Sequence, residues 1–211
     1  MRRAIDERRW DLALKIGDLV EPAARASKSL VGKIEALLMR AEAATYSKKV
    51  DLAQQTLSQI RNIQRIDPQT QGRAEILQSE LFLMDRELDQ ALGATNRAHD
   101  HFRSIDHRQG MSDSLLLQGR LLFSQNRFEA AADRFAQAVR LAAQNSLQWA
   151  RAQSNLIEVR LRLRWSAGID REVERFLRRA QSNGDVHHIA YATYAAGMYF
   201  MVNIMSVHYS F

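Results

Sequence analysis

The sequence predicts an all-α protein made of repeated helix pairs. Of its 211 residues only 9 are glycine and 2 are proline, while residues that favour helices, such as alanine, leucine, arginine and glutamate, dominate. A hydrophobic share of 46% with a charged share of 26% is typical of a globular chain that can bury a core. An alanine also recurs every 38 to 40 residues, at Ala13, Ala53, Ala91 and Ala131. Such a period indicates an array of helical repeats.

A second column of residues has the same period. Each recurring alanine opens the second helix of a pair, and the first helix carries a small residue at Ala41, Ser79 or Gly119. In a weaker fourth copy, Val173 takes the place of the alanine. Short polar turns then separate predicted helices at 32–46 and 50–63, 72–84 and 88–102, 111–125 and 128–143, and 147–165 and 170–181.

The helix pairs are expected to stack on one another. A single pair leaves apolar surface on both sides, so it is stable only against its neighbours. We therefore predict one domain, 1–211, that forms a right-handed α-solenoid, a superhelix with the first helices inside. Small residues where helices approach closely should be buried, namely Ala91, Gly119, Ala131 and Ala138. The predicted repeats are 31–68, 69–107, 108–145 and 146–184, with partial repeats at 1–30 and 185–211.

The two ends of the chain do not complete a pair. Residues 6–19, with Trp10, Ala13 and Leu14 on one face, have the pattern of a second helix without a first helix. Residues 186–211 have the pattern of a first helix without a second helix. Either the chain is part of a longer protein, or its uncovered terminal helices mediate self-association. We favour the longer protein, because the terminal repeats of complete arrays turn a polar face outward.

The segment 119–141 carries the most specific motif. It has a small residue in the first helix, Gly119, and an alanine four residues before a phenylalanine in the second, Ala131 and Phe135. This spacing resembles the tetratricopeptide repeat (TPR), although the proline that usually follows the second helix is absent. The period near 40 is similar to the long variety of kinesin light chains, of a G-protein regulator family with polarity functions, and of bacterial signalling proteins such as the maltose-activator type of transcription regulator. The resemblance covers nearly the whole chain and implies a fold far more specifically than a function.

Several chemistries lack the residues that they need. With no cysteine, the chain has no disulfide, no thiolate zinc site and no thiol nucleophile. Gly-rich phosphate loops and the H-E-x-x-H and G-x-S-x-G motifs are also missing, so we expect a non-enzymatic protein without a cofactor. The first residues mix acids with arginines and lack the apolar segment of a signal peptide, so we expect a cytoplasmic location.

The nearest approach to a metal site is the stretch with His99, Asp100, His101, Asp106 and His107. His99 and His101 are two residues apart and point about 200° apart around a helix, so they cannot both face one ion. Cationic side chains near a helix C-terminus also interact favourably with the helix dipole. We therefore expect no metal here.

Two stretches raise the question of a membrane or a nucleic acid as partner. The run 189–211 has no charged residue, but its polar residues and the lack of a basic flank make it a poor membrane span. The stretch 151–179 holds eight arginines against four acids, but only Trp165 and Phe176 could stack on bases. The net charge of +6 comes from 30 basic and 24 acidic residues, a mixture typical of solvated helix faces. We expect neither partner.

The preferred function is a protein-interaction scaffold whose concave groove, lined by the first helices, holds an extended peptide or a helix of another protein. The alternative, implied by the resemblance to the maltose-activator type, is a ligand-sensing regulatory module that binds a small effector. The residues that the period places in the groove are Leu38, Glu42, Thr45, Ile76, Glu80, Leu83, Leu116, Arg120, Phe123, Leu156, Arg160 and Arg164.

The predicted groove has a charge gradient. Glu42 and Glu80 make it acidic toward the N-terminal repeats, and Arg120, Arg160 and Arg164 make it basic toward the C-terminal ones. It differs from the chaperone-tail-binding members of the family, whose grooves clamp a terminal carboxylate, because the two glutamates would repel that group. A partner should then carry basic residues at one end and acidic residues at the other. The opposing interpretation is that these charges are only solvated.

Overall fold

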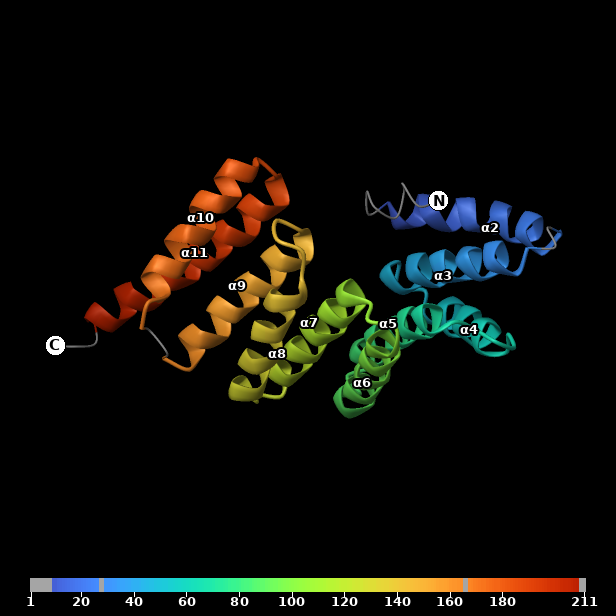
Figure 1. Ribbon diagram of the computed structural model, residues 1–211, viewed down its shortest axis with the longest axis horizontal. Helices are drawn as coiled ribbons and strands as arrows, with labels where there is room; N and C mark the ends of the chain where they lie inside the picture. The colour runs from blue at the N-terminus through green and yellow to red at the C-terminus, as the bar shows by residue number, and fades with distance from the viewer. Residues whose placement is uncertain (1–8, 27–28, 165–166, 209–211) are drawn as a thin grey trace. The chain divides into compact units, whose positions relative to one another are not determined.

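The computed structural model describes residues 9–26, 29–164 and 167–208. Within these ranges the chain forms ten helices and no strand, which confirms the predicted all-α class (Figure 1). The helices are α2 (Trp10–Ala26), α3 (Leu30–Tyr46), α4 (Val50–Arg61), α5 (Pro68–Met84), α6 (Leu88–Ser104), α7 (Arg108–Ser124), α8 (Phe128–Leu141), α9 (Leu147–Arg162), α10 (Ile169–Asn183) and α11 (Val186–His208).

Helices α3 and α5 begin directly after capping residues, earlier than the apolar pattern alone predicts. The Ser29 side chain accepts a hydrogen bond from Gly32 N (3.2 Å), so α3 begins two residues before the predicted start at 32. Asp67 accepts a hydrogen bond from Thr70 N (2.9 Å), and with Pro68 in the first turn α5 begins four residues early. The terminal prediction 6–19 starts outside the described residues, and α2 continues past Pro22.

The chain forms two compact units, Met1–Gly110 and Met111–Phe211, called here the N-terminal and C-terminal units. The boundary lies in the first turn of α7, close to the predicted repeat boundary between 107 and 108.

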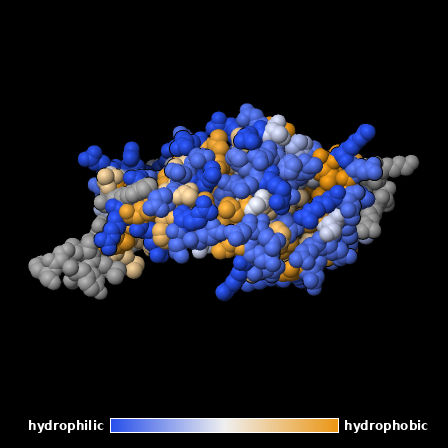
Figure 2. All heavy atoms as spheres, turned by 90° about the horizontal axis from the view of Figure 1, so that it is seen from below, coloured by the Kyte–Doolittle hydropathy of each residue, from blue (hydrophilic) through white to orange (hydrophobic). Residues whose placement is uncertain are grey.

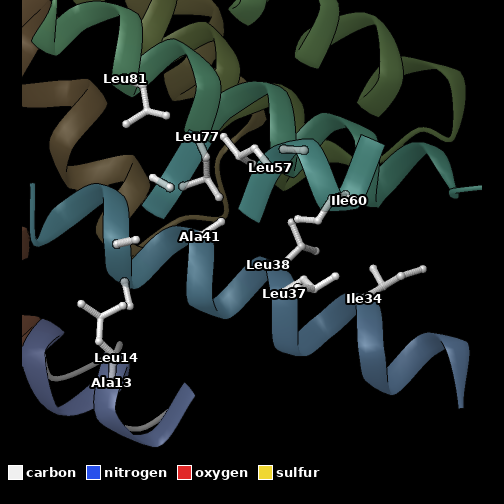
Figure 3. Close-up of a cluster of buried hydrophobic side chains, with 14 residues drawn as sticks. Ala13, Leu14, Ile34, Leu37, Leu38, Ala41, Leu57, Ile60, Leu77 and Leu81 are labelled. Carbon is white, nitrogen blue, oxygen red and sulfur yellow. The ribbon is translucent and has the colours of Figure 1, made fainter. Parts of the chain in front are cut away.

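The core of the N-terminal unit is a cluster of aliphatic side chains from α2 to α5 (Figure 3). The recurring alanines Ala13 and Ala53 are fully buried in it. Around them, leucines and isoleucines from the facing helices point toward one another. The labelled members of this cluster are Ala13, Leu14, Ile34, Leu37, Leu38, Ala41, Leu57, Ile60, Leu77 and Leu81.

The small residues of the first helices lie where the second helices approach most closely. A Cβ atom added to Gly119 would lie 2.4 Å from the Phe135 ring of α8, so only glycine fits there. In the preceding pair the Ser79 hydroxyl donates a hydrogen bond of 2.9 Å to the carbonyl oxygen of Ala91. The predicted burial of Gly119, Ala91, Ala131 and Ala138 is confirmed, and the three alanines have no exposed surface.

The turns within the helix pairs repeat as well. The second residue after each of the first helices α3, α5, α7 and α9 has a left-handed backbone: Lys48 (φ 59°), Arg86 (φ 61°), Asn126 (φ 60°) and Arg164 (φ 56°). In the first three turns the next residue donates its N–H to a carbonyl five residues back, as in the Schellman motif that ends many helices. The backbone thus shows the period that the alanines predicted.

The C-terminal unit has its own core, in which α9, α10 and α11 pack together. Val173, predicted to replace the recurring alanine, is buried there, beside Phe176. Gly168 and Gly184 begin and end α10 with left-handed backbones (φ 76° and 69°). The uncharged C-terminal run falls in α11 as far as His208, and residues 209–211 lie outside the described ranges. None of the described helices has the length and hydropathy needed to cross a membrane.

The contact between Gly119 and Phe135 yields a test with a matched control. Gly119→Ala forces the methyl group into the buried ring, so we expect a loss of about 1–3 kcal/mol in the free energy of unfolding. Gly93→Ala, in the middle of α6, meets only the tip of Arg97 at 3.7 Å and should stabilise the chain by about 0.5–1 kcal/mol through helix propensity. Thermal denaturation followed by circular dichroism measures both. If both variants changed the free energy of unfolding in the same direction, the result would contradict the close contact between Gly119 and Phe135.

Candidate functional site

A small pocket formed mainly by first helices lies between α7 and α9 in the C-terminal unit. It has a volume of about 190 Å³. We call it the Arg120 pocket, and its lining consists of Arg120, Phe123, Ser124, Phe135, Asn155 and Glu158.

Helical spacing brings the lining residues to one place. Arg120, Phe123 and Ser124 are separated by three and four positions, so they share one face of α7. Asn155 and Glu158 are likewise three positions apart on α9. Phe135, the ring that presses on Gly119, is only 2% exposed. The pocket is therefore a small hollow with an aromatic floor and polar walls.

Charged and aromatic groups meet at the rim of the pocket. The Tyr194 hydroxyl of α11 donates a hydrogen bond of 3.4 Å to Glu158 Oε2. Burial first, and then the negative charge of Glu158, raise the pKa of Tyr194. The Arg162 guanidinium lies 5.7 Å from the centre of the Phe123 ring, a cation–π arrangement. The rim thus presents a carboxylate, a guanidinium and an aromatic face.

The Asn155 amide stands out among these groups. No side chain or backbone group in the described part of the chain forms a hydrogen bond with it. An amide side chain carries both a donor and an acceptor, as a peptide group does. Asn155 can therefore pair with the backbone of a bound extended segment.

Three of the predicted groove residues are buried, which corrects the prediction for them. Leu38 belongs to the aliphatic core of the N-terminal unit, and the Thr45 hydroxyl donates a hydrogen bond of 2.8 Å to the Ala41 carbonyl of its own helix. Leu116 is also buried, with 4% of its surface exposed. All three side chains therefore lie on the side of their helices that faces the core.

Arg160 is a second correction, because it points toward α10 rather than to an open groove. Its guanidinium forms an ion pair with Glu172 and also donates a hydrogen bond of 3.3 Å to the Ala167 carbonyl. Gln153 Nε2 donates a hydrogen bond of 2.7 Å to the other oxygen of Glu172. The face of α9 that carries Gln153 and Arg160 is thus used within the unit, and the positive charge is neutralised.

The remaining predicted residues divide between the two units. Arg120 and Phe123 come together in the pocket, whereas Leu156 is half-buried and Arg164 lies exposed in the turn after α9. Sequence reasoning missed Ser124, although it follows Arg120 by one helical turn. It also missed Asn155 and Glu158, because only the rotation of α9 brings them to α7. The residues in the N-terminal unit, all half-buried, are Glu42, Ile76, Glu80 and Leu83.

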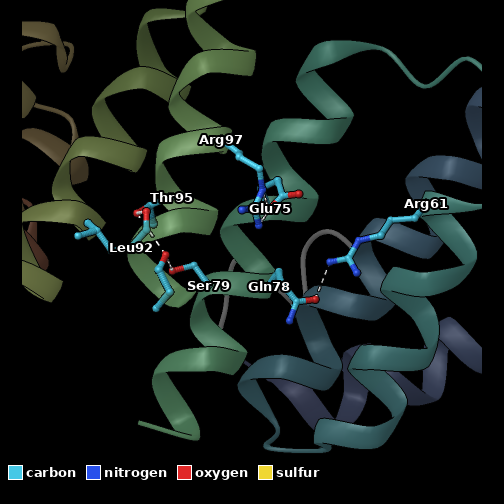
Figure 4. A network of polar contacts seen from close by, with 8 residues as sticks. Arg61, Glu75, Gln78, Ser79, Leu92, Thr95 and Arg97 are labelled. Carbon is cyan, nitrogen blue, oxygen red and sulfur yellow. Dashed lines mark hydrogen bonds and ion pairs between the residues drawn. The ribbon is translucent and has the colours of Figure 1, made fainter. Parts of the chain in front are cut away.

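Paired charges connect neighbouring helices in the N-terminal unit. Arg73 Nη1 of α5 lies 2.7 Å from a Glu35 carboxylate oxygen of α3. In Figure 4 Glu75 of α5 pairs with Arg97 of α6 at 2.8 Å, and Arg61 donates a hydrogen bond of 2.6 Å to Gln78. These charges have structural partners, which agrees with the interpretation of most charges as ordinary helix surface. Hydrophilic residues also cover most of the face drawn in Figure 2.

A larger cleft, about 310 Å³, lies between α9 and α10 in the C-terminal unit. Its polar groups already bond to the protein: the Arg179 guanidinium lies 4.8 Å from the Trp149 ring centre and donates hydrogen bonds to the side chains of Gln144 and Asn145. Its lining consists of Trp149, Gln153, Glu172, Arg175, Phe176 and Arg179.

One residue of the histidine-rich stretch, His107, has a structural role. His107 Nδ1 accepts a hydrogen bond of 3.0 Å from Gly110 N at the start of α7, and its ring stacks on Phe102. Among the residues with described positions, no group of three metal-ligating side chains could hold an ion. His107 therefore caps a helix.

No protein-family model matches the chain, and a search of curated proteins gives no match either. The resemblance to tetratricopeptide repeats therefore rests on the residues and on the repeated helix pairs alone.

Asp113 of α7 provides a test by pH. Burial raises its pKa to about 6, and the positive charge of Arg151 lowers it only in part. Because the folded state holds this proton more tightly than the unfolded state does, stability is lost as the pH rises from about 4 through about 6. At about 1.4 kcal/mol per pKa unit, the loss is roughly 2–3 kcal/mol.

Asp113→Asn removes this titration. We expect the variant to be more stable than the parent at pH 7.5 and to lose most of that advantage at pH 4. Urea unfolding of the parent and the variant at both pH values measures the difference between their free energies of unfolding. The other titrating groups contribute equally to both proteins, so they cancel in this difference. A difference that does not change with pH would mean that Asp113 titrates normally.

Proposed function

We propose that the chain is a non-enzymatic protein-interaction module whose Arg120 pocket receives one side chain of an extended peptide segment. One observation supports this proposal most directly. The Arg120 pocket brings together an aromatic floor, the charged side chains of Arg120 and Glu158, and the unpaired amide of Asn155. The Asn155 amide lies on a first helix and can form the hydrogen bonds that a peptide backbone forms. Such a group suits peptide recognition better than catalysis.

The size of the pocket favours a peptide side chain over a complete effector. Pockets for small effectors usually measure about 300–1,000 Å³, whereas the Arg120 pocket has about 190 Å³. One apolar side chain of a peptide fits such a volume. Flanking acidic residues of the peptide would meet Arg120 and Arg162, while a basic residue would meet Glu158.

We further propose that the helix pairs belong to the tetratricopeptide class and stack as a right-handed superhelix in the cytoplasm. The repeated left-handed turns and the close contact of Gly119 with Phe135 support this arrangement. In it, the N-terminal first helices would extend the binding surface with Glu42 and Glu80. The predicted gradient is weaker at its basic end than the sequence implied, because Arg160 is neutralised by Glu172.

The alternative, a ligand-sensing regulatory module, has one observation in its favour. The cleft between α9 and α10 reaches about 310 Å³ and combines Trp149 with two arginines, Arg175 and Arg179. Those arginines also make hydrogen bonds within the C-terminal unit. The peptide-binding function is therefore preferred.

A peptide-display selection on the whole chain tests the proposal. Selected peptides should bind the parent and Asn183→Arg, an exposed control of the same chemical change at the end of α10. Asn155→Arg fills the pocket and removes its amide, so we expect at least tenfold weaker binding. Isothermal titration measures the affinities. Equal affinity for the two variants would place the peptide elsewhere, and failure to select any peptide would refute the function.

A further inference from the structure

The described part of the C-terminal unit covers α11 on one face only. His188, Ala192, Ala195 and Ala196 are buried, and the Tyr191 carbonyl accepts a hydrogen bond of 3.3 Å from Ser154 of α9. On the opposite side large apolar side chains are exposed: Val186 by 76%, Phe200 by 58% and Met201 by 62% of their surface. We call this side the uncovered α11 face, and it consists of Val186, Ala190, Tyr194, Gly197, Phe200 and Met201.

Gly197 at the centre of this face corresponds to Gly119 of α7. The two glycines are 78 positions apart, which is two repeat lengths. At Gly119 the Phe135 ring of α8 fills the space next to the backbone, whereas a Cβ atom on Gly197 would meet no described atom within 4 Å. The position that α8 covers in the earlier pair therefore lies open on α11.

We propose that the uncovered α11 face docks an amphipathic helix of another chain that has the chemistry of α8. Such a helix presents an alanine and, four residues later, a phenylalanine, as Ala131 and Phe135 do toward α7. The phenylalanine would cover Gly197, and Tyr194 and Met201 would pack on either side of it.

Charge also selects the occupant. From Val186 to His208 α11 contains no Asp, Glu, Lys or Arg, so a charge on the docked face would be buried without a partner. The buried residues of α8 are uncharged, while its charged residues Glu129, Asp133 and Arg140 are exposed and Arg134 is half-buried. A second copy's uncovered α11 face fits less well, because it has glycine where α8 has phenylalanine and would leave the space over Gly197 unfilled.

The inference is tested with a labelled peptide of residues 128–141, the α8 sequence, and the whole chain. Fluorescence anisotropy should show saturable binding to the parent. Gly197→Arg places a long charged side chain in the middle of the face and should weaken binding at least tenfold. Gly93→Arg, the same change at a helical glycine of α6 whose added Cβ atom would meet only the tip of Arg97 at 3.7 Å, should bind as the parent does. Circular dichroism checks that both variants keep their helicity.

Two peptide variants test the chemistry of the occupant. Replacing the phenylalanine that corresponds to Phe135 with alanine should abolish binding, whereas Asp133→Asn on the exposed side of α8 should not change it. Asn155→Arg, which blocks the Arg120 pocket, should also leave binding unchanged, so failure here is distinguishable from failure of the proposed function.

Three results would overturn the inference. Equal binding to Gly197→Arg and the parent would place the peptide elsewhere, for example in exchange with α8 itself. An absence of binding up to the solubility limit of the peptide would show that the face does not accept such a helix. Dimers in sedimentation that Gly197→Arg dissociates would identify a second copy as the occupant.

Discussion

The close contact between a first and a second helix is the constraint on which each helix pair depends. In the pair of α7 and α8 the Phe135 ring occupies the space that any side chain at position 119 would need. This contact sets the distance between two helices that are joined by a turn of only three residues, 125–127. Because the ring is almost completely buried, it stabilises the pair and also forms the floor of the Arg120 pocket.

Other contacts between first and second helices satisfy the same constraint with different chemistry. Ser79 approaches α6 closely enough for its hydroxyl to donate a hydrogen bond to the Ala91 carbonyl, and Ser112 does the same to the Ala138 carbonyl of α8 at 3.0 Å. An aromatic ring again packs against glycine at Phe102, which lies against Gly72 of α5 and against Gly110 in the first turn of α7. A small residue is thus required at each contact, but its partner varies. This variation explains why the period is clear while the individual motifs are irregular.

The site depends on a finer feature, the rotation of α9 about its axis. Arg160 and Gln153 both bond to Glu172 of α10, and this arrangement turns Asn155 and Glu158 toward α7. The simple extension of the repeat period would have placed Arg160 beside Arg120 instead. An ion pair between half-buried groups contributes modest stability, but its geometry selects which side chains of α9 become available for binding.

The sequence by itself determined the helical class, the approximate bounds of the helices and the small residues at their contacts. These features follow from local propensity and from a period that recurs in every pair, so each copy supports the others. The sequence also identified Arg120 and Phe123, which lie one turn apart on one helix. Only the tertiary structure decided that Leu38, Thr45 and Leu116 face the core and that Asn155 and Glu158 complete the pocket. The physical reason is that helical spacing fixes which residues share a face, whereas the packing of neighbouring helices decides which face is buried.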